Sequence, residues 1–139
     1  MKRYHYETTT TLPAEALYAA MSDVTRWPEW DAGLASVTSD GPATRGAAFV
    51  LTPKGGPRVT LHVTEAEPGR VFTDVARLPL GRMQTEHRYT ALGDLTRVEL
   101  IITVSGPLGF LWDRLIARPQ AREAAAQTRA FLAFAERYA

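Results

Sequence analysis

Tight-turn signals between residues 34 and 104 constrain the fold more than any other feature of the chain. They separate short runs of strand-forming residues, and they are Asp40-Gly41-Pro42, Gly55-Gly56-Pro57, Pro68-Gly69, Pro79-Leu80-Gly81 and Gly93-Asp94. Six strands fit between these marks. Parallel strands would need crossover connections of about a dozen residues or more, for which the turns leave no room. The pattern therefore predicts a succession of antiparallel hairpins.

Hydrophobic and polar residues alternate within these runs. In two of them apolar side chains occupy every second position, at Val59, Leu61, Val63, Val98, Leu100, Ile102 and Val104. A period of two places such side chains on one face of a strand. Residues 3–11 also alternate and predict an opening strand. We expect a sheet with one covered face and one wet face.

Two short helices are expected between the opening strand and the hairpins. Pro13 and Glu15 suit the first turn of a helix, and the apolar residues that follow them support about two turns. A second helix between residues 23 and 31 must be short and broken. Pro28 is the reason, because proline disfavours helical geometry at the residue before it.

The chain after Gly106-Pro107 is rich in Ala, Arg and Leu, which predicts a long C-terminal helix with a kink at Pro119. The element order predicts an α+β fold, with this helix lying across a strongly curved, seven-stranded antiparallel sheet. The helix carries small residues such as Ala121 and Ala124 toward the sheet. These either leave room for a ligand or permit close packing, and both alternatives stay open.

Composition narrows the class of protein. The chain has 139 residues, 45% of them hydrophobic, no cysteine, and a formal charge of +1, which fits one globular domain over residues 1–139. The charge balance gives no reason to expect a nucleic-acid partner. No apolar stretch approaches the roughly 18 residues that span a bilayer, and the first residues lack the apolar run of a secretory signal. We expect a cytoplasmic protein without integral membrane association.

Several short motifs occur in a characteristic order along the whole chain. They are Leu12-Pro13-Ala14-Glu15, Val24-Thr25-Arg26-Trp27-Pro28-Glu29-Trp30, Glu86-His87-Arg88-Tyr89, Thr96-Arg97-Val98 and Ser105-Gly106-Pro107-Leu108. Their order and spacing resemble the SRPBCC superfamily, in particular its polyketide cyclase/dehydrase and lipid-transport branch. The resemblance implies the helix-grip, or START-like, fold, with a deep hydrophobic cavity between the sheet and the C-terminal helix. Functions in the superfamily range from lipid carriage to aromatase/cyclase chemistry and chaperone regulation, so the fold leaves function open.

One strand carries the most informative polar row. Met83, Thr85, His87 and Tyr89 share a face by the period of two, and this face is expected to be concave. His87 and Tyr89 are candidates for positioning a carbonyl or hydroxyl, or for exchanging protons near neutral pH. The alternative is a buried histidine whose hydrogen bonds are satisfied within the protein. No second group of known geometry supports catalysis.

The expected ligand-binding residues come from the sheet, the tryptophan segment and the last helix. They are Trp30, Phe49, Leu51, Leu61, Val63, Thr85, His87, Tyr89, Leu100, Ile102 and Phe131. By the resemblance, the segment with Trp27 and Trp30 lies beside the cavity entrance. The alternative is that both rings are packing residues, since buried aromatic side chains dominate many cores.

Other kinds of site lack support in the sequence. The three histidines do not show metal-ligand spacing, so no metal and no other cofactor is expected. The serines lack a nucleophile-elbow setting. Glu29 and Asp31 are two residues apart and Asp74 stands alone, which gives no persuasive carboxylate pair for glycoside hydrolysis.

These observations favour a protein that binds a small hydrophobic or amphipathic ligand, such as a lipid, a polyketide or an aromatic metabolite, and that is a monomer or homodimer. One alternative is an aromatase/cyclase or dehydrase-like enzyme in which His87 or Tyr89 transfers a proton. That alternative needs one more polar group in the cavity. A second alternative is a protein-interaction module, similar to relatives that regulate chaperones or ribosomes.

Overall fold

Seven antiparallel strands form a single sheet in the order β1-β7-β6-β5-β4-β3-β2. The computed structural model describes residues 1–139, and its strands are β1 (Lys2–Thr10), β2 (Leu34–Ser39), β3 (Ala48–Pro53), β4 (Val59–Glu67), β5 (Val71–Leu78), β6 (Gly81–Leu92) and β7 (Leu95–Ser105). Strands β2 to β7 follow one another as hairpins, and β1 closes the sheet beside β7. The predicted α+β fold with a seven-stranded antiparallel sheet is therefore confirmed.

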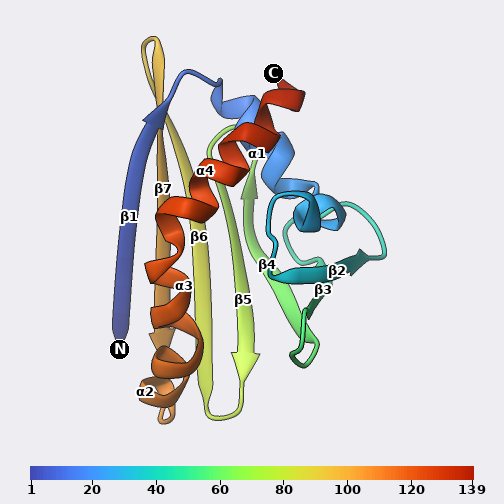
Figure 1. Ribbon diagram of the computed structural model, residues 1–139, viewed down its shortest axis with the longest axis vertical. Coiled ribbons are helices and arrows are strands. Elements are labelled where there is room, and N and C mark those ends of the chain that lie inside the picture. Colours follow the sequence, from blue (N-terminus) through green and yellow to red (C-terminus); the bar gives the residue numbers. More distant parts are fainter.

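The sheet bends toward the helices. Figure 1 shows β2 and β3 running across the direction of β1 and β7. The strand register shifts between Leu34 and Ser36 in β2 and between Val63 and Glu65 in β4. Irregularities of this kind increase the local twist of a strand and bend it. The second shift lies opposite Asp74 on β5, a position that matters for the site.

Two short helices connect β1 to β2, as the sequence predicts. Helix α1 (Ala14–Ser22) buries Leu17, Ala20 and Met21 against the sheet. The 3-10 helix η1 (Val24–Glu29) follows directly and contains Pro28. The indole nitrogen of Trp27 donates a hydrogen bond to the Met21 carbonyl at 2.8 Å, which fixes η1 against α1.

The C-terminal helical segment lies across the sheet in front of β6 and β7 (Figure 1). It consists of α2 (Gly109–Trp112), the π-helix η2 (Asp113–Ala117), α3 (Arg118–Arg122), α4 (Ala124–Ala135) and the 3-10 helix η3 (Glu136–Tyr138). The sequence predicts one kink, at Pro119, whereas the structure shows two irregularities. They are the π turn of η2, which ends two residues before Pro119, and the interruption at Glu123.

Apolar side chains form two buried clusters beneath the helices. The larger cluster joins α1, η1 and α4 to the middle of the sheet and includes Leu17, Phe72 and Phe134. The smaller one, below η2, consists of Met83, Ile102, Val104 and Ala117. Members of both clusters border a cavity between the sheet and the C-terminal helices.

Candidate functional site

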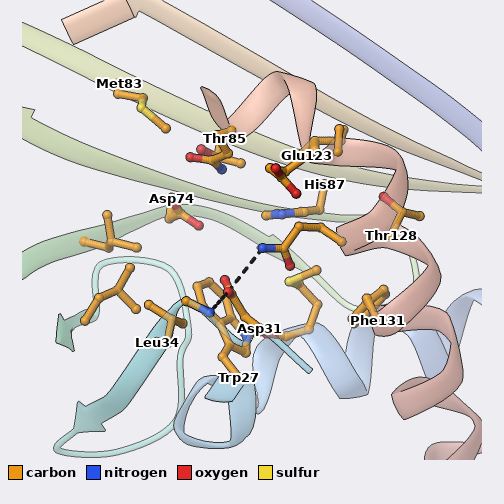
Figure 2. Close-up of a pocket in the computed structure, with 18 of the residues that line it drawn as sticks. Trp27, Asp31, Leu34, Asp74, Met83, Thr85, His87, Glu123, Thr128 and Phe131 are labelled. Atoms are coloured by element: carbon orange, nitrogen blue, oxygen red, sulfur yellow. Dashed lines mark hydrogen bonds between the residues drawn. The ribbon is translucent and has the colours of Figure 1, made fainter. Parts of the chain in front are cut away.

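A cavity of about 440 Å³ lies between the concave face of the sheet and the C-terminal helices. Sixteen of its 28 lining residues are hydrophobic. In Figure 2, Asp74, Thr85 and His87 extend into it from the strands, while Glu123, Thr128 and Phe131 approach from the helices. The volume falls within the range of small-molecule sites, about 300 to 1,000 Å³.

Most of the residues that the sequence suggests for ligand binding do line this cavity. They are Trp30, Leu51, Leu61, Thr85, His87, Tyr89, Leu100 and Phe131. Their strand members were identified by the period of two, which correctly separates the inward face of β4, β6 and β7 from the outward face. The structure thus brings the Trp30 segment, the polar row of β6 and the last helix around one space.

Phe49, Val63 and Ile102 need a correction, because none of them lines this cavity. Phe49 is 1% exposed, and the Trp27 ring packs edge-on against it with 5.2 Å between ring centroids. Val63 is buried in the larger cluster and Ile102 in the smaller one. A position on the inward face of the sheet is therefore insufficient, since neighbouring side chains cover both ends of that face.

Asp74 is the polar group that the sequence analysis left aside. It lies on β5 directly opposite Thr85 on β6. His87 lies two residues beyond Thr85 on β6. Only 4% of Asp74 is exposed. Burial, with no opposing hydrogen bond or ion pair, raises the pKa of its carboxyl from 3.8 to about 7. At neutral pH the carboxyl is therefore divided between its protonated and ionised forms.

One ring nitrogen of His87 forms a hydrogen bond within the protein, and the other is available to the cavity, so both alternatives from the sequence apply in part. Its Nδ1 lies 3.1 Å from the Phe72 carbonyl, an acceptor, so Nδ1 carries the proton in this hydrogen bond. The other ring nitrogen, Nε2, is left as an acceptor, and the ring borders the cavity. Burial lowers the pKa of His87 to about 4, against the smaller opposing effect of the Phe72 hydrogen bond. The imidazole is thus neutral at pH 7.

Three buried polar atoms around the cavity have no hydrogen-bond partner. They are Trp30 Nε1, the Tyr89 hydroxyl and Gln127 Oε1, and all three residues line the cavity. Burial raises the pKa of the Tyr89 hydroxyl, which keeps it protonated. Buried polar groups are paired in most proteins, so these three atoms are free to pair with whatever occupies the cavity.

A hydrogen-bonded pair joins the loop after η1 to α4. Asp31 Oδ1 accepts a hydrogen bond from Gln127 Nε2 at 3.1 Å and another from the Gly33 amide at 3.0 Å (Figure 2). Glu123, at the interruption between α3 and α4, also borders the cavity although it is exposed. The pairing of Asp31 with Gln127 was not predictable from local patterns, because 96 residues separate the two. Glu123 was not among the predicted site residues either.

The histidines lie at different places in the structure. His5 on β1 pairs with Glu99 at 2.9 Å, His62 stands on β4, and His87 borders the cavity. No group of three or more His, Asp or Glu side chains is arranged to hold a metal ion. No helix combines the length and the apolar character needed to cross a membrane.

The fold and the cavity define a helix-grip protein of the SRPBCC class, as the motifs indicate. Residues 1–136 match the family described as polyketide cyclase / dehydrase and lipid transport, so the chain belongs to this family. A comparison with curated proteins gave no match.

Solved structures share the fold at low sequence identity. The Zhui aromatase/cyclase from Streptomyces sp. R1128 has a TM-score of 0.77 and 17% identity, over 98% of this chain and 94% of that one. Hypothetical protein jhp0584 from Helicobacter pylori has a TM-score of 0.76 and 11% identity, over 96% and 88% of the two chains. Ara h 8.0201 has a TM-score of 0.72 and 11% identity, over 96% of this chain and 97% of that one.

Proposed function

We propose that this protein binds one small amphipathic molecule, of the lipid, polyketide or aromatic class, in the cavity between the sheet and the C-terminal helices. The observation that carries the proposal is the cavity itself, whose mainly apolar wall holds a few unpaired polar groups. A wall of this composition removes apolar ligand surface from water, while a few polar groups fix the orientation of the ligand.

The polar groups favour an amphipathic ligand over a plain hydrocarbon. Leaving a buried donor or acceptor unpaired costs about 1 to 3 kcal/mol. A ligand carbonyl can accept from Trp30 Nε1 or from the Tyr89 hydroxyl, and a ligand hydroxyl can donate to His87 Nε2. Each such contact recovers part of that free energy on binding.

Mass spectrometry of the purified protein, first native and then after solvent extraction, tests whether a small molecule accompanies it. A stoichiometric amphipathic molecule supports the proposal and names the chemistry. Titration with the neutral fluorescent probe N-phenyl-1-naphthylamine gives a second readout that needs no natural ligand.

A matched pair of variants locates the probe. Ala124 is buried and lines the cavity, whereas Ala126 on the same helix is exposed and does not. We expect Ala124→Phe to weaken probe binding about tenfold or more, because the new ring occupies the space, and Ala126→Phe to bind as the wild type does. Equal binding by the two variants would refute a ligand in this cavity. Melting curves show that both variants are folded.

The histidine provides a second test of the same proposal. We expect His87→Ala to weaken ligand binding more than it lowers the melting temperature, because Nε2 contacts the ligand and not the protein. Equal losses in both measurements would favour a purely structural histidine.

An enzyme of the dehydrase type is a second candidate, favoured by Asp74. The enzyme hypothesis needed one more polar group in the cavity, and Asp74 lies opposite Thr85 and close to His87. His87 Nε2 can accept a proton at neutral pH, and protonated Asp74 can donate one. With a β-hydroxy ketone, His87 would take the α-proton as Asp74 protonates the leaving hydroxyl, which gives an enone and water.

Water loss from 4-hydroxy-4-phenylbutan-2-one, followed by absorbance of the enone, tests this candidate. We expect His87→Gln and Asp74→Asn to lower the rate at least about tenfold while probe binding stays measurable. If the wild-type protein gives no higher rate than buffer alone, the result counts against an elimination reaction of this substrate class.

A further inference from the structure

The charged side chains that line the cavity are all acidic. Asp31, Asp74, Glu99 and Glu123 are among the 28 lining residues, whereas none of the chain's 16 Lys and Arg residues is. The whole chain has a formal charge of +1, so the negative cavity is not a consequence of an acidic composition. The cations lie elsewhere on the molecule.

Three of the four carboxylates lack a cationic partner within the protein. Glu99 is paired with His5 at 2.9 Å. The seven ion pairs of the structure include neither Asp31 nor Glu123 nor Asp74. Asp31 accepts hydrogen bonds only from neutral donors. An anionic ligand would therefore meet repulsion that no side chain of the cavity compensates.

The deepest of these carboxylates points to a ligand independently of the charge pattern. Asp74 is 4% exposed and has no hydrogen-bond or ion-pair partner, and Figure 2 shows its carboxyl directed into the cavity between the strands and the C-terminal helices. Tyr89, which is 3% exposed, presents an unpaired hydroxyl to the same space. Buried carboxyls are rarely left without partners, so a ligand that donates to Asp74 would complete the site.

Two side chains of β6 next to Asp74 in the strand register offer hydrogen-bond acceptors. Thr85 stands directly opposite Asp74 in the strand register, and its hydroxyl oxygen can accept a hydrogen bond. His87 is two residues further along β6 and offers the Nε2 lone pair. A primary ammonium group has three donors and no acceptor, which matches a carboxylate, a hydroxyl and a neutral imidazole.

We propose that the cavity binds a hydrophobic primary amine, whose ammonium group donates to Asp74, Thr85 and His87 while its apolar body fills the remaining space. This inference rests on the proposed ligand-binding function and names the class of ligand. Asp31 and Glu123 add attraction for the cation from the helix side of the cavity. Fatty acids and phosphate esters are expected to bind more weakly because of the same charges.

The test compares three molecules that share a naphthalene body: naphthalen-2-ylmethylamine, naphthalen-2-ylmethanol and naphthalene-2-carboxylate. Dissociation constants are measured at pH 7.5 by calorimetry on the full chain, and binding of neutral N-phenyl-1-naphthylamine is measured beside them. We expect the amine to bind at least about tenfold more tightly than the carboxylate, with the alcohol between them.

Variants assign the preference to one side chain. Asp74→Asn keeps the shape of the side chain and removes its charge, so amine affinity should fall about tenfold or more and alcohol affinity should fall much less. Glu67→Gln makes the same charge change at an exposed position on β4 outside the cavity and should alter neither affinity.

The outcomes distinguish failure of the amine proposal from failure of the ligand-binding function on which it rests. Binding of the neutral probe and the alcohol without preference for the amine, or full amine affinity in Asp74→Asn, overturns the amine proposal and leaves the ligand-binding function intact. Failure of all four molecules to bind overturns both.

Discussion

Asp74 and Asp113 are covered to the same degree and differ in charge state. Asp74 on β5 is 4% exposed and Asp113 on η2 is 5% exposed. The Tyr4 hydroxyl donates to Asp113 at 2.6 Å and Arg118 at 3.2 Å, and these contacts hold the pKa of Asp113 below its ordinary 3.8. Asp74 has no such partner, and burial raises its pKa to about 7. The exposed areas are similar, but Asp74 is buried deep in the protein and Asp113 lies just below the surface. Depth of burial and hydrogen-bond partners together decide which carboxyl stays ionised.

The two carboxyls have correspondingly different places in the fold. Asp113 connects β1 to the C-terminal helices through residues 109 positions apart in the chain. It lies just below the surface, where half-exposed Arg118 covers it. Asp74 connects nothing and faces the cavity. The first carboxyl stabilises the fold, whereas the second lowers the stability of the empty protein and is available to a ligand.

The largest effect is expected from removing the charge of Asp74. The folded state keeps this proton up to about pH 7 and the unfolded state loses it near 3.8, so stability falls as the pH rises between these values. Asp74→Asn abolishes this loss and should raise the free energy of unfolding at pH 8 by about 2 to 4 kcal/mol. Urea denaturation measures the gain.

Two controls examine the cause of this gain. Glu67→Gln removes an exposed carboxylate from β4 and should leave stability nearly unchanged. Near pH 4 the advantage of Asp74→Asn should shrink to about 0.5 kcal/mol, because the folded state is then protonated at Asp74 and the unfolded state is about half protonated. A gain of equal size at both pH values would contradict the charge explanation.

The opposite result is expected at the other carboxyl. Asp113→Asn should lower the free energy of unfolding by about 1 to 3 kcal/mol, because the charged acceptor of Tyr4 and Arg118 is lost. Urea denaturation at pH 7 measures the loss. Tyr4→Phe should have a smaller effect in the Asp113→Asn background than in the wild type, since the first change removes the bond that the loss of charge has already weakened. Additive effects would mean that this bond contributes nothing.

The pH dependence of stability contains two opposing contributions. Asp74 makes the protein less stable as the pH rises from about 4 to 7. His87 has a pKa lowered to about 4 in the folded state against 6.5 when unfolded, so the unfolded state binds the extra proton and stability rises with pH across that range. The two slopes nearly cancel in the wild type.

Single variants should reveal each slope. Between pH 4.5 and 6.5 the stability of Asp74→Asn should rise, and that of His87→Gln should fall, by about 1 kcal/mol per pH unit. Urea midpoints at three pH values measure both trends against the flatter wild type. Parallel profiles for the two variants would show that these groups do not titrate as their surroundings predict.

Local signals in the sequence were sufficient to predict the sheet. Turn residues and the period of two depend on neighbouring positions, so they gave the succession of hairpins from β2 to β7, the inward row of Thr85, His87 and Tyr89, and the covered face. The same rule places Asp74 inward between Phe72 and Ala76. A single carboxyl between apolar residues on an inward face therefore indicates a buried polar group, and this local signal was sufficient to predict Asp74 as a cavity residue.

The helix side of the cavity was less predictable, because it depends on tertiary contacts. The pairing of Asp31 with Gln127 joins two segments that no local pattern relates. Glu123 borders the cavity at an interruption of the helix that no local pattern in the sequence predicts. Which inward side chains reach the cavity also depends on neighbours, as the Trp27 ring shows by covering Phe49.

The smallest effects are expected at two tyrosines, one with a hydrogen-bonded hydroxyl (Tyr4) and one with an unpaired hydroxyl (Tyr89). Tyr4→Phe removes the donor to Asp113 and should lower the free energy of unfolding by about 1 kcal/mol. Tyr89→Phe removes a buried hydroxyl without a partner, so stability should not fall and should rise by about 1 kcal/mol. Urea denaturation at pH 7 compares the two. A loss in Tyr89→Phe as large as that in Tyr4→Phe would mean that the empty cavity already satisfies the Tyr89 hydroxyl, for example through ordered water, and that a ligand gains nothing by pairing with it.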